Sequence, residues 1–198
     1  MVIKMVKTFF ILIILLKSLN SYSQIILNED RAFTNGRNAP VNCKAGFAVI
    51  TNSSGKLISA SLSADQKFYN GKNASVNCLK DNKVEFNNEG DIISCTLAID
   101  QTFYNGKNDP VLCLKKTKVE FYDSGKLKST IMAESNTFYN GRKAPVYCEK
   151  HQKVYFYESG NIQSATLSAK QTFFTLKDQF RIFNKGDMVY FSDEGNVN

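Results

Sequence analysis

The sequence predicts an all-β fold in which tandem antiparallel hairpins form an elongated coiled sheet or solenoid. The first observation is an internal repeat, because an aromatic-x-Asn-Gly-cation phrase returns every 35 residues. Its copies are Phe33–Arg37, Phe68–Lys72, Phe103–Lys107 and Phe138–Arg142, with a degenerate fifth copy at Phe173–Lys177. Such a strict register is typical of one supersecondary unit used repeatedly, each copy burying its apolar face against its neighbours.

The first 23 residues have the layout of a secretory signal peptide. An apolar run over 9–16 follows a basic start, and Ser21-Tyr22-Ser23 puts small residues where signal peptidase recognises them. A transmembrane anchor needs about 18 apolar residues, whereas Lys17 interrupts this run early. We predict a signal peptide over 1–23 and a mature chain from Gln24. The mature chain is then exported to the periplasm, the outer surface or the medium, with no transmembrane anchor.

Glycines mark two turns in each copy, and this is the second observation. The intervals between them alternate between 19 and 16 residues. The positions are Gly36, Gly55, Gly71, Gly90, Gly106, Gly125, Gly141 and Gly160. Because glycine supplies the positive φ that tight hairpin turns require, both series predict hairpins.

Short alternating runs between the turns are the third observation, and they read as strands. Val84-Glu85-Phe86 precedes a second turn, and Ile162-Gln163-Ser164-Ala165-Thr166-Leu167 follows one. The residues directly after the second turns are out of phase with the buried row, which predicts a β-bulge at that point. They are Leu57, Ile92, Leu127 and Ile162.

About ten half-units, each a hairpin, predict roughly twenty short strands, and no helix pattern appears after the leader. A flat open sheet of that size would curl, split or coil. The alternative to the solenoid is a five-bladed β-propeller with four strands per blade. A 35-residue blade is short, and the last copy stops just after its second turn, which favours the open form. We therefore predict a single repeat domain over 24–198, with about five units and the last one truncated.

Four cysteines occupy the same position in successive copies: Cys43, Cys78, Cys113 and Cys148. Equivalent positions in stacked β units lie about 10 Å or more apart, whereas a disulfide needs Cα atoms within about 7 Å. These cysteines therefore cannot pair with one another, and their alternation with Leu and Met predicts buried core positions. Cys95 lies outside the series, and a bridge from it to Cys78 or to Cys113 stays open.

The mature chain is only mildly basic. Removing the three leader lysines lowers the formal charge from +7 to +4, and the remaining Lys and Arg are spread over every repeat. Nucleic-acid binding calls for a concentrated basic face. The charge distribution instead indicates a solvated surface and no nucleic-acid partner.

The repeated phrases resemble MORN-type hairpin repeats, in particular the bacterial variant of YwqK-like proteins, which are described as antitoxins. The matching phrases are F-Y-D-S-G-K-L at Phe121–Leu127, F-Y-E-S-G-N-I at Phe156–Ile162 and F-Y-N-G-K at Phe68 and Phe103. The resemblance covers nearly all of the mature chain and implies an array of hairpins. The 35-residue double unit and its cysteine depart from the ordinary family spacing, and an antitoxin of a cytosolic toxin would not carry a signal peptide.

No catalytic motif is present in the sequence: there is no G-x-S-x-G, no H-E-x-x-H and no phosphate-binding glycine loop. The single histidine, His151, follows Cys148 by three residues. Residues three apart on a strand point to opposite faces, and structural zinc needs four ligands. We expect no catalytic residue, no metal and no cofactor, and therefore a protein that is not an enzyme.

A row of tyrosines is the best candidate for function. Tyr69, Tyr104 and Tyr139 are each followed by Asn-Gly and then by Lys72, Lys107 or Arg142. The preceding phenylalanines should face the core, so the tyrosines should point outward. Exposed Tyr and Arg suit a binding surface for sugar rings or an extended partner. The competing interpretation is that each ring covers the next hairpin, a contact of about 0.2–1 kcal/mol.

These observations predict an exported repeat module that binds a protein or glycan at the cell envelope or outside it. A purely structural envelope protein is one alternative. A YwqK-like antitoxin or regulator is the other, if the leader is not a signal.

Overall fold

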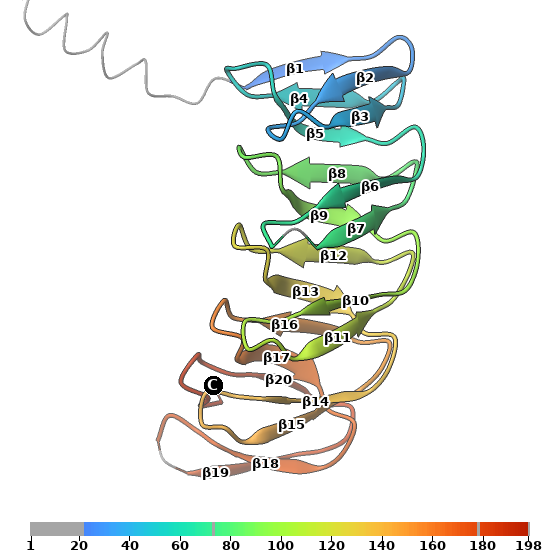
Figure 1. The fold of residues 1–198 in the computed structure, drawn as a ribbon. Coiled ribbons are helices and arrows are strands. Elements are labelled where there is room, and N and C mark those ends of the chain that lie inside the picture. The colour runs from blue at the N-terminus through green and yellow to red at the C-terminus, as the bar shows by residue number, and fades with distance from the viewer. Residues whose placement is uncertain (1–21, 73, 178, 198) are drawn as a thin grey trace, which may run out of the picture.

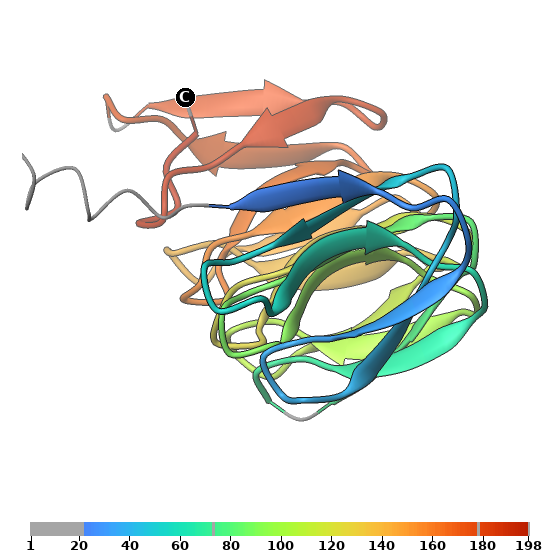
Figure 2. The same cartoon turned by 90° about the horizontal axis from the view of Figure 1, so that it is seen from above.

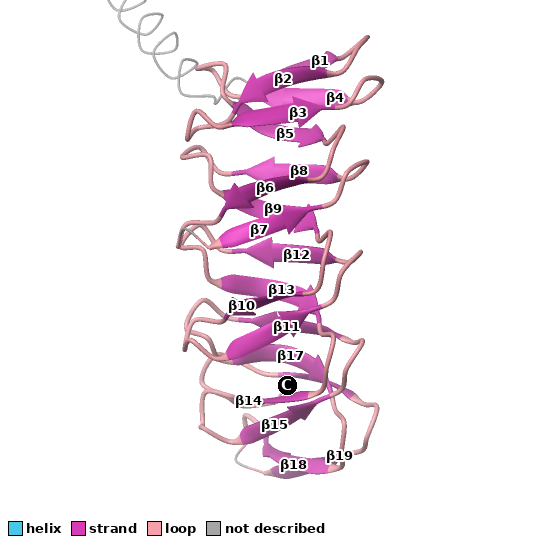
Figure 3. Cartoon of the chain, turned by 45° about the vertical axis from the view of Figure 1, so that its right-hand side comes forward, coloured by secondary structure: helices cyan, strands magenta, loops and turns pink. Residues whose placement is uncertain are grey.

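The computed structural model describes residues 22–72, 74–177 and 179–197, and within these ranges every regular element is a β-strand (Figure 3). There are twenty strands of three to five residues, numbered β1 to β20 along the chain. The prediction of an all-β chain with about twenty short strands is confirmed.

Ten strands form one long antiparallel sheet that runs the length of the molecule (Figure 1). In spatial order they are β1 (Ser23–Ile26), β4 (Ala48–Thr51), β5 (Leu57–Ser61), β8 (Lys83–Phe86), β9 (Ile92–Thr96), β12 (Lys118–Phe121), β13 (Leu127–Ile131), β16 (Lys153–Phe156), β17 (Ile162–Thr166) and β20 (Met188–Tyr190). The sheet is open, with β1 at one edge and β20 at the other. The elongated array is therefore confirmed, and the five-bladed propeller is wrong because the sheet does not close.

The other ten strands form five separate hairpins. They are β2 (Arg31–Thr34) with β3 (Pro40–Cys43), β6 (Gln66–Tyr69) with β7 (Ser75–Cys78), β10 (Gln101–Tyr104) with β11 (Pro110–Cys113), β14 (Asn136–Tyr139) with β15 (Pro145–Cys148), and β18 (Gln171–Phe174) with β19 (Phe180–Phe183). Seen from above, the chain coils between this row of hairpins and the long sheet (Figure 2). Each unit is thus one hairpin followed by two sheet strands.

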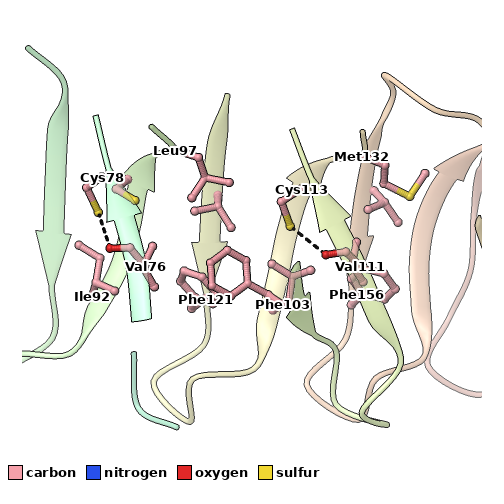
Figure 4. Packing of buried hydrophobic residues seen from close by; sticks show 14 of the residues in the cluster. Val76, Cys78, Ile92, Leu97, Phe103, Val111, Cys113, Phe121, Met132 and Phe156 are labelled. Carbon is pink, nitrogen blue, oxygen red and sulfur yellow. Dashed lines mark hydrogen bonds between the residues drawn. The ribbon is translucent and has the colours of Figure 1, made fainter. Parts of the chain in front are cut away.

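The hydrophobic core lies between these two layers. In four of the hairpins the last residue is a cysteine, and its backbone pairs with a residue on the sheet side in an isolated antiparallel β-bridge. Examples are Cys78 with Leu97 and Cys113 with Met132 (Figure 4). In the four hairpins after the first, a phenylalanine also meets one from the sheet side edge-on, and the ring centroids of Phe103 and Phe121 lie 4.9 Å apart. A fully buried phenylalanine contributes about 1.5–3 kcal/mol. The repeated aromatic pairs therefore contribute to the packing between the two layers.

The predicted bulge is present in the sheet. In each of four units the strand register shifts beside the second turn. In the first unit Ile50 pairs with Ser59 and Thr51 pairs with Leu57, so Ile58, just after the turn, is the extra residue. The extra residue turns Leu57 into the core and leaves Ile58 on the outer face. This explains why the residues after these turns are out of phase with the buried row.

The Asn-Gly phrase locks consecutive units together through their turns. The buried Asn105 side chain donates from Nδ2 to the carbonyl of Gly160 in the next unit, at 3.1 Å. Its Oδ1 accepts from the backbone of Lys107 and Asp109, both at 2.9 Å. Asn35, Asn70 and Asn140 donate to Gly90, Gly125 and Gly195 in the same way.

The glycines of the Asn-Gly turns serve close approach rather than positive φ, so that part of the sequence prediction is wrong. A Cβ atom built on Gly106 would fall inside van der Waals contact with the Glu158 carbonyl of the next unit. The left-handed residue of these turns is instead the one two positions later, such as Asn108 with φ of 65°. In the second turns the prediction holds, because Gly125 and its equivalents do have positive φ.

The predicted signal peptide lies outside the described residues except for Tyr22 and Ser23, and β1 begins at Ser23, one residue before the expected cleavage point. Across the described ranges, the structure has no helix of the length and apolarity needed to cross a membrane.

Candidate functional site: the aromatic face of the hairpin row

The outward side of the hairpins carries a row of aromatic rings, which we call the aromatic ladder: Tyr69, Tyr104, Tyr139 and Phe174. The tyrosine side chains are exposed to 48%, 52% and 45%. The residue before each ring is a buried phenylalanine, because successive side chains of a strand point to opposite faces. The prediction that the tyrosines point outward is confirmed.

Each ladder ring has a cross-strand neighbour on the same face of its hairpin. Tyr104 stands opposite Pro110, and Tyr139 stands opposite Pro145. In the last hairpin, Phe174 and Phe180 are opposite each other, with ring centroids 4.1 Å apart. Tyr69 stands opposite Ser75, so the face offers flat aromatic surfaces in each of these hairpins and pyrrolidine surfaces in two of them.

The predicted cations lie beside the ladder, in the hairpin turns. Lys72 donates from Nζ to Asn108 Oδ1 at 3.4 Å, and Arg142 donates from Nε to Asn196 Oδ1 at 2.7 Å. The guanidinium of Arg142 also lies 5.0 Å from the centre of the Phe174 ring. Lys72, Lys107 and Arg142 are exposed and form a basic border along one edge of the ladder.

The C-terminal end of this face carries exposed side chains beyond the predicted tyrosines and cations. Phe180 and Ile182 are exposed to 67% and 60%, and Tyr147 to 41%. A shallow groove there is lined by Phe174, Phe180 and Arg142 among others. The 35-residue register applied to Tyr139 points to Phe174, so the degenerate fifth copy carried the signal.

Side-chain amides hold the hairpins in fixed register. Gln171 accepts from the backbone N–H of Tyr147 at 2.8 Å and donates to the carbonyl of Pro145 at 2.9 Å. Gln66 and Gln101 make the same two bonds to the hairpin before them. The shorter Asn136 makes the bond to the carbonyl alone, at 3.1 Å. The amides thus take the place of backbone pairing between hairpins and fix the spacing of the ladder.

The opposite face, on the outside of the long sheet, has a different character. Across neighbouring strands of the sheet, serines alternate with larger residues, as in the row Ser94, Glu120, Ser129 and Tyr155. The Ser129 hydroxyl donates to the Glu120 carboxylate. Lys118 lies 2.7 Å from Glu120, and Lys83 lies 2.6 Å from Glu85. These charged side chains are paired with one another within the sheet.

The five cysteines are buried free thiols, as predicted for the repeated four. Burial raises the pKa of Cys43 to about 11 and that of Cys148 to about 12. The thiol of Cys78 donates to the carbonyl of Val76 at 3.8 Å, and burial together with the neighbouring thiol of Cys95 raises the pKa of Cys78. Cys113 instead meets the hydroxyl of Thr130. Of the two partners left open for Cys95, Cys78 is therefore the one in contact.

The structure separates Cys148 from His151. Cys148 is fully buried, whereas His151 is exposed in a loop at a left-handed position with φ of 59°. Among the described residues, no group of three or more His, Cys, Asp or Glu side chains is arranged to hold a metal ion.

The chain matches no protein-family model and no curated protein. Among solved structures it is similar to a protein of unknown function from Bacteroides caccae, with 15% identity and a TM-score of 0.20. The match covers 84% of this chain and 78% of the other. At this TM-score the likeness carries no argument about function.

Proposed function

We propose that this protein is an exported, non-enzymatic binding module whose aromatic ladder contacts a partner at the cell envelope or outside it. One observation carries the proposal: Tyr69, Tyr104 and Tyr139 are exposed, while the Phe and Asn beside each of them are buried in the core and the turn interlock. Within the repeated phrase, the exposed tyrosine rings therefore contribute less to the packing of the fold than the buried Phe and Asn beside them.

The composition of the face supports binding. Tyrosine and arginine are enriched where binding energy concentrates. Repeat arrays present extended surfaces for long ligands. The partner classes that fit are a protein segment and a glycan.

The test is a comparison of the wild type with the triple change Tyr69→Ala, Tyr104→Ala, Tyr139→Ala in pull-downs from envelope extracts and on a glycan array. We expect the folded triple variant to lose the partners that the wild type retains. Affinity should fall stepwise with each substitution if several repeats engage one ligand. A folded triple variant with unchanged partners would show that the ladder is structural, as in a purely structural envelope protein.

The location is tested separately. Expression of the full chain in a bacterium should yield protein that begins at or near Gln24, outside the cytosol. Uncleaved protein in the cytosol would favour the YwqK-like regulator instead.

A further inference from the structure

The two edge strands of the long sheet, β1 and β20, lack the features that usually protect a sheet edge (Figure 1). Natural edge strands carry charged side chains or proline, because their unpaired N–H and C=O groups can otherwise pair with another chain. Neither β1 nor β20 contains a charged residue or a proline. At the position that is Lys118 or Lys153 in inner strands, β20 has Met188. Both edges are therefore open to a further strand.

Both edges also carry exposed apolar side chains. Ile26 of β1 is exposed to 67% and Tyr190 of β20 to 59%. Ile25 is exposed as well, although Ala60 and Ala165 are buried at the same place in inner strands. Repeat arrays stay soluble because their terminal units have a polar outer face. These two ends instead carry apolar surface whose burial is favourable.

The inner strands show what lies beside a strand of the β20 type. Tyr155 of β16 holds the same place as Tyr190, because each pairs with a serine of the sheet strand before it. On its other side, Tyr155 pairs with Ser164 of β17. Within the part of the chain that the structure describes, no residue pairs with Tyr190 on that side.

Strand β1 is of the type that fills this place. Gln24 of β1 pairs with Ile50 of β4. One unit later, Ser59 of β5 pairs with Glu85 of β8, the counterpart of Ile50. Gln24 therefore holds the place of Ser59, which is also the place of Ser164. Since the far side of β1 is an edge of the described sheet, β1 of a second copy matches the open place beside β20.

The hairpin row can be joined across the same boundary. Inside the row, the Asn136 side chain donates to the carbonyl of Pro110 in the hairpin before it, at 3.1 Å. In the last hairpin, Phe180 holds the place of Pro110. In the first hairpin, Arg31 holds the place of Asn136. The Arg31 guanidinium of a second copy can therefore donate to the Phe180 carbonyl in the same way.

The second turns at the two ends are complementary in charge. Successive second turns are in contact along the array, and Ser159 donates to Asp193 of the next turn at 2.6 Å. The last of these turns carries Asp193 and Glu194 and no cation, whereas the first carries Lys56 and no acid. A head-to-tail contact brings these two turns together, and opposite charge favours it.

The other charges near the two edges do not oppose such a contact. Residues 27–33, after β1, hold two acids and one cation, which are Glu29, Asp30 and Arg31. Residues 180–190, up to the end of β20, hold two cations and one acid, which are Arg181, Lys185 and Asp187. The two ends are therefore opposite in sign here, although Asp30 and Asp187 already accept from backbone N–H groups.

We propose that this protein assembles head to tail, with β1 of one copy pairing antiparallel with the free edge of β20 of another and Gln24 opposite Tyr190. On the same outer face, two residues further along each strand, Ile26 comes opposite Met188. Because the two contacting surfaces are different, the copies form an open filament in which the long sheet continues. This assembly goes beyond the proposed binding function and does not depend on it.

The experiment measures the size of the purified full chain, expressed in a bacterium, by analytical ultracentrifugation over a concentration series. Head-to-tail association depends on concentration, so we expect the wild type to form species longer than dimers that grow as the concentration rises. A wild type that stays monomeric throughout the series would overturn the proposal.

Single variants test each edge. Ile26→Lys and Tyr190→Lys each place a charge where the second copy covers it, and burying an unpaired charge is costly, so each should weaken self-association by at least about tenfold. The matched control is Ile99→Lys, which exchanges an exposed isoleucine of an inner unit for lysine and should assemble like the wild type. Circular dichroism confirms that each variant is folded. Equal weakening in Ile99→Lys, or none in the two edge variants, would contradict an edge-to-edge contact.

A mixture of the two edge variants distinguishes head-to-tail pairing from other contacts between copies. Ile26→Lys keeps an intact β20 edge and Tyr190→Lys keeps an intact β1 edge. At a concentration where each alone is monomeric, the mixture should therefore form dimers with one copy of each and nothing longer. A mixture without dimers would disprove the pairing. Dimers of Ile26→Lys alone would show that two β20 edges pair with each other, which also disproves it.

Discussion

The two outer faces of this molecule are built on the same repeat and yet differ in how their side chains are satisfied. On the long sheet, Glu120 is held by Ser129 and Lys118. On the hairpin row, Tyr69, Tyr104 and Tyr139 stay about half exposed. On the sheet face the charged side chains are paired with one another, and an exposed ring there, Tyr190 at 59%, lies in the edge strand β20. The hairpin face instead presents an exposed ring in three successive units.

The difference shows that, within one repeat unit, some positions stabilise the fold and others form the exposed surface. Within the phrase at Phe103–Lys107, the phenylalanine enters the core, the asparagine and glycine interlock with the next unit, and only the tyrosine and lysine remain outside. The stability of the fold and the chemistry of the exposed face therefore depend on different, adjacent residues, and each can be substituted without changing the other.

The largest effect expected from this division is a contrast between two neighbours. Phe103→Ala removes a fully buried ring and its edge-on partner, and should lower the free energy of unfolding by about 3–5 kcal/mol. Tyr104→Ala should lower it by less than about 1 kcal/mol. Urea unfolding followed by circular dichroism measures both. Equal losses would mean that the Tyr104 ring belongs to the core.

A second test is aimed at the turn edge that joins the units. Gly106→Ala forces a Cβ against the Glu158 carbonyl and should cost about 3 kcal/mol of unfolding free energy, since overpacking against backbone is hard to relieve. The control is Gly46→Asp, because Asp81 occupies the equivalent left-handed position without strain on a neighbour. An alanine at 106 that is as well tolerated as the control would disprove the interlock.

A third test cross-links the two layers. Both thiols are buried in the folded protein, so the protein is unfolded in urea and refolded with oxidised glutathione. One thiolate attacks the glutathione disulfide and releases a reduced glutathione, and the second thiol then displaces the bound glutathione, which leaves one disulfide between Cys78 and Cys95 and two reduced glutathiones. Closing a loop of roughly 15 residues stabilises a fold by up to about 3 kcal/mol. Non-reducing mass spectrometry should find this pair, and Thr130→Cys should add a bridge to Cys113. A Cys95–Cys113 bridge in the wild type would contradict the contacts found here.

The smallest effect concerns a loop between the layers. His151 is left-handed at a position that is glycine in two other units, Gly46 and Gly186. Replacing it by glycine should raise the free energy of unfolding by about 1 kcal/mol, because a β-carbon is unfavourable in that conformation. Thermal unfolding of His151→Gly against the wild type tests this, and an unchanged or lower midpoint would show that the imidazole has a role in the fold.

Much of the architecture follows from the sequence because turns and alternation are local signals. The hairpins, the bulge after Gly55 and the buried Cys43 series are all read from residues close in the chain. The division into a ten-stranded sheet and five hairpins is not local, since it depends on which strands pair across units. The close approach at Gly36 is likewise invisible in the sequence, because its partner Asn88 lies in the next unit.

The candidate site was only partly predictable for the same reason. The exposure of Tyr69, Tyr104 and Tyr139 follows from strand alternation. Phe180 lies opposite Phe174, as Pro145 lies opposite Tyr139, and this register could not be predicted because the fifth copy of the repeat is degenerate. The MORN-type resemblance and the leader over 1–23 remain predictions.

The most direct test of the claim that the hairpin row is the binding face is hydroxyl-radical footprinting, since tyrosines report on both faces. The full chain is expressed in a bacterium, and oxidation is compared between protein in the envelope fraction and purified mature protein. We predict protection of Tyr69, Tyr104 and Tyr139 in the envelope fraction, with Tyr155 on the sheet face oxidised equally in both. Protection of Tyr155 instead, or no difference at the three ladder tyrosines, would contradict the account.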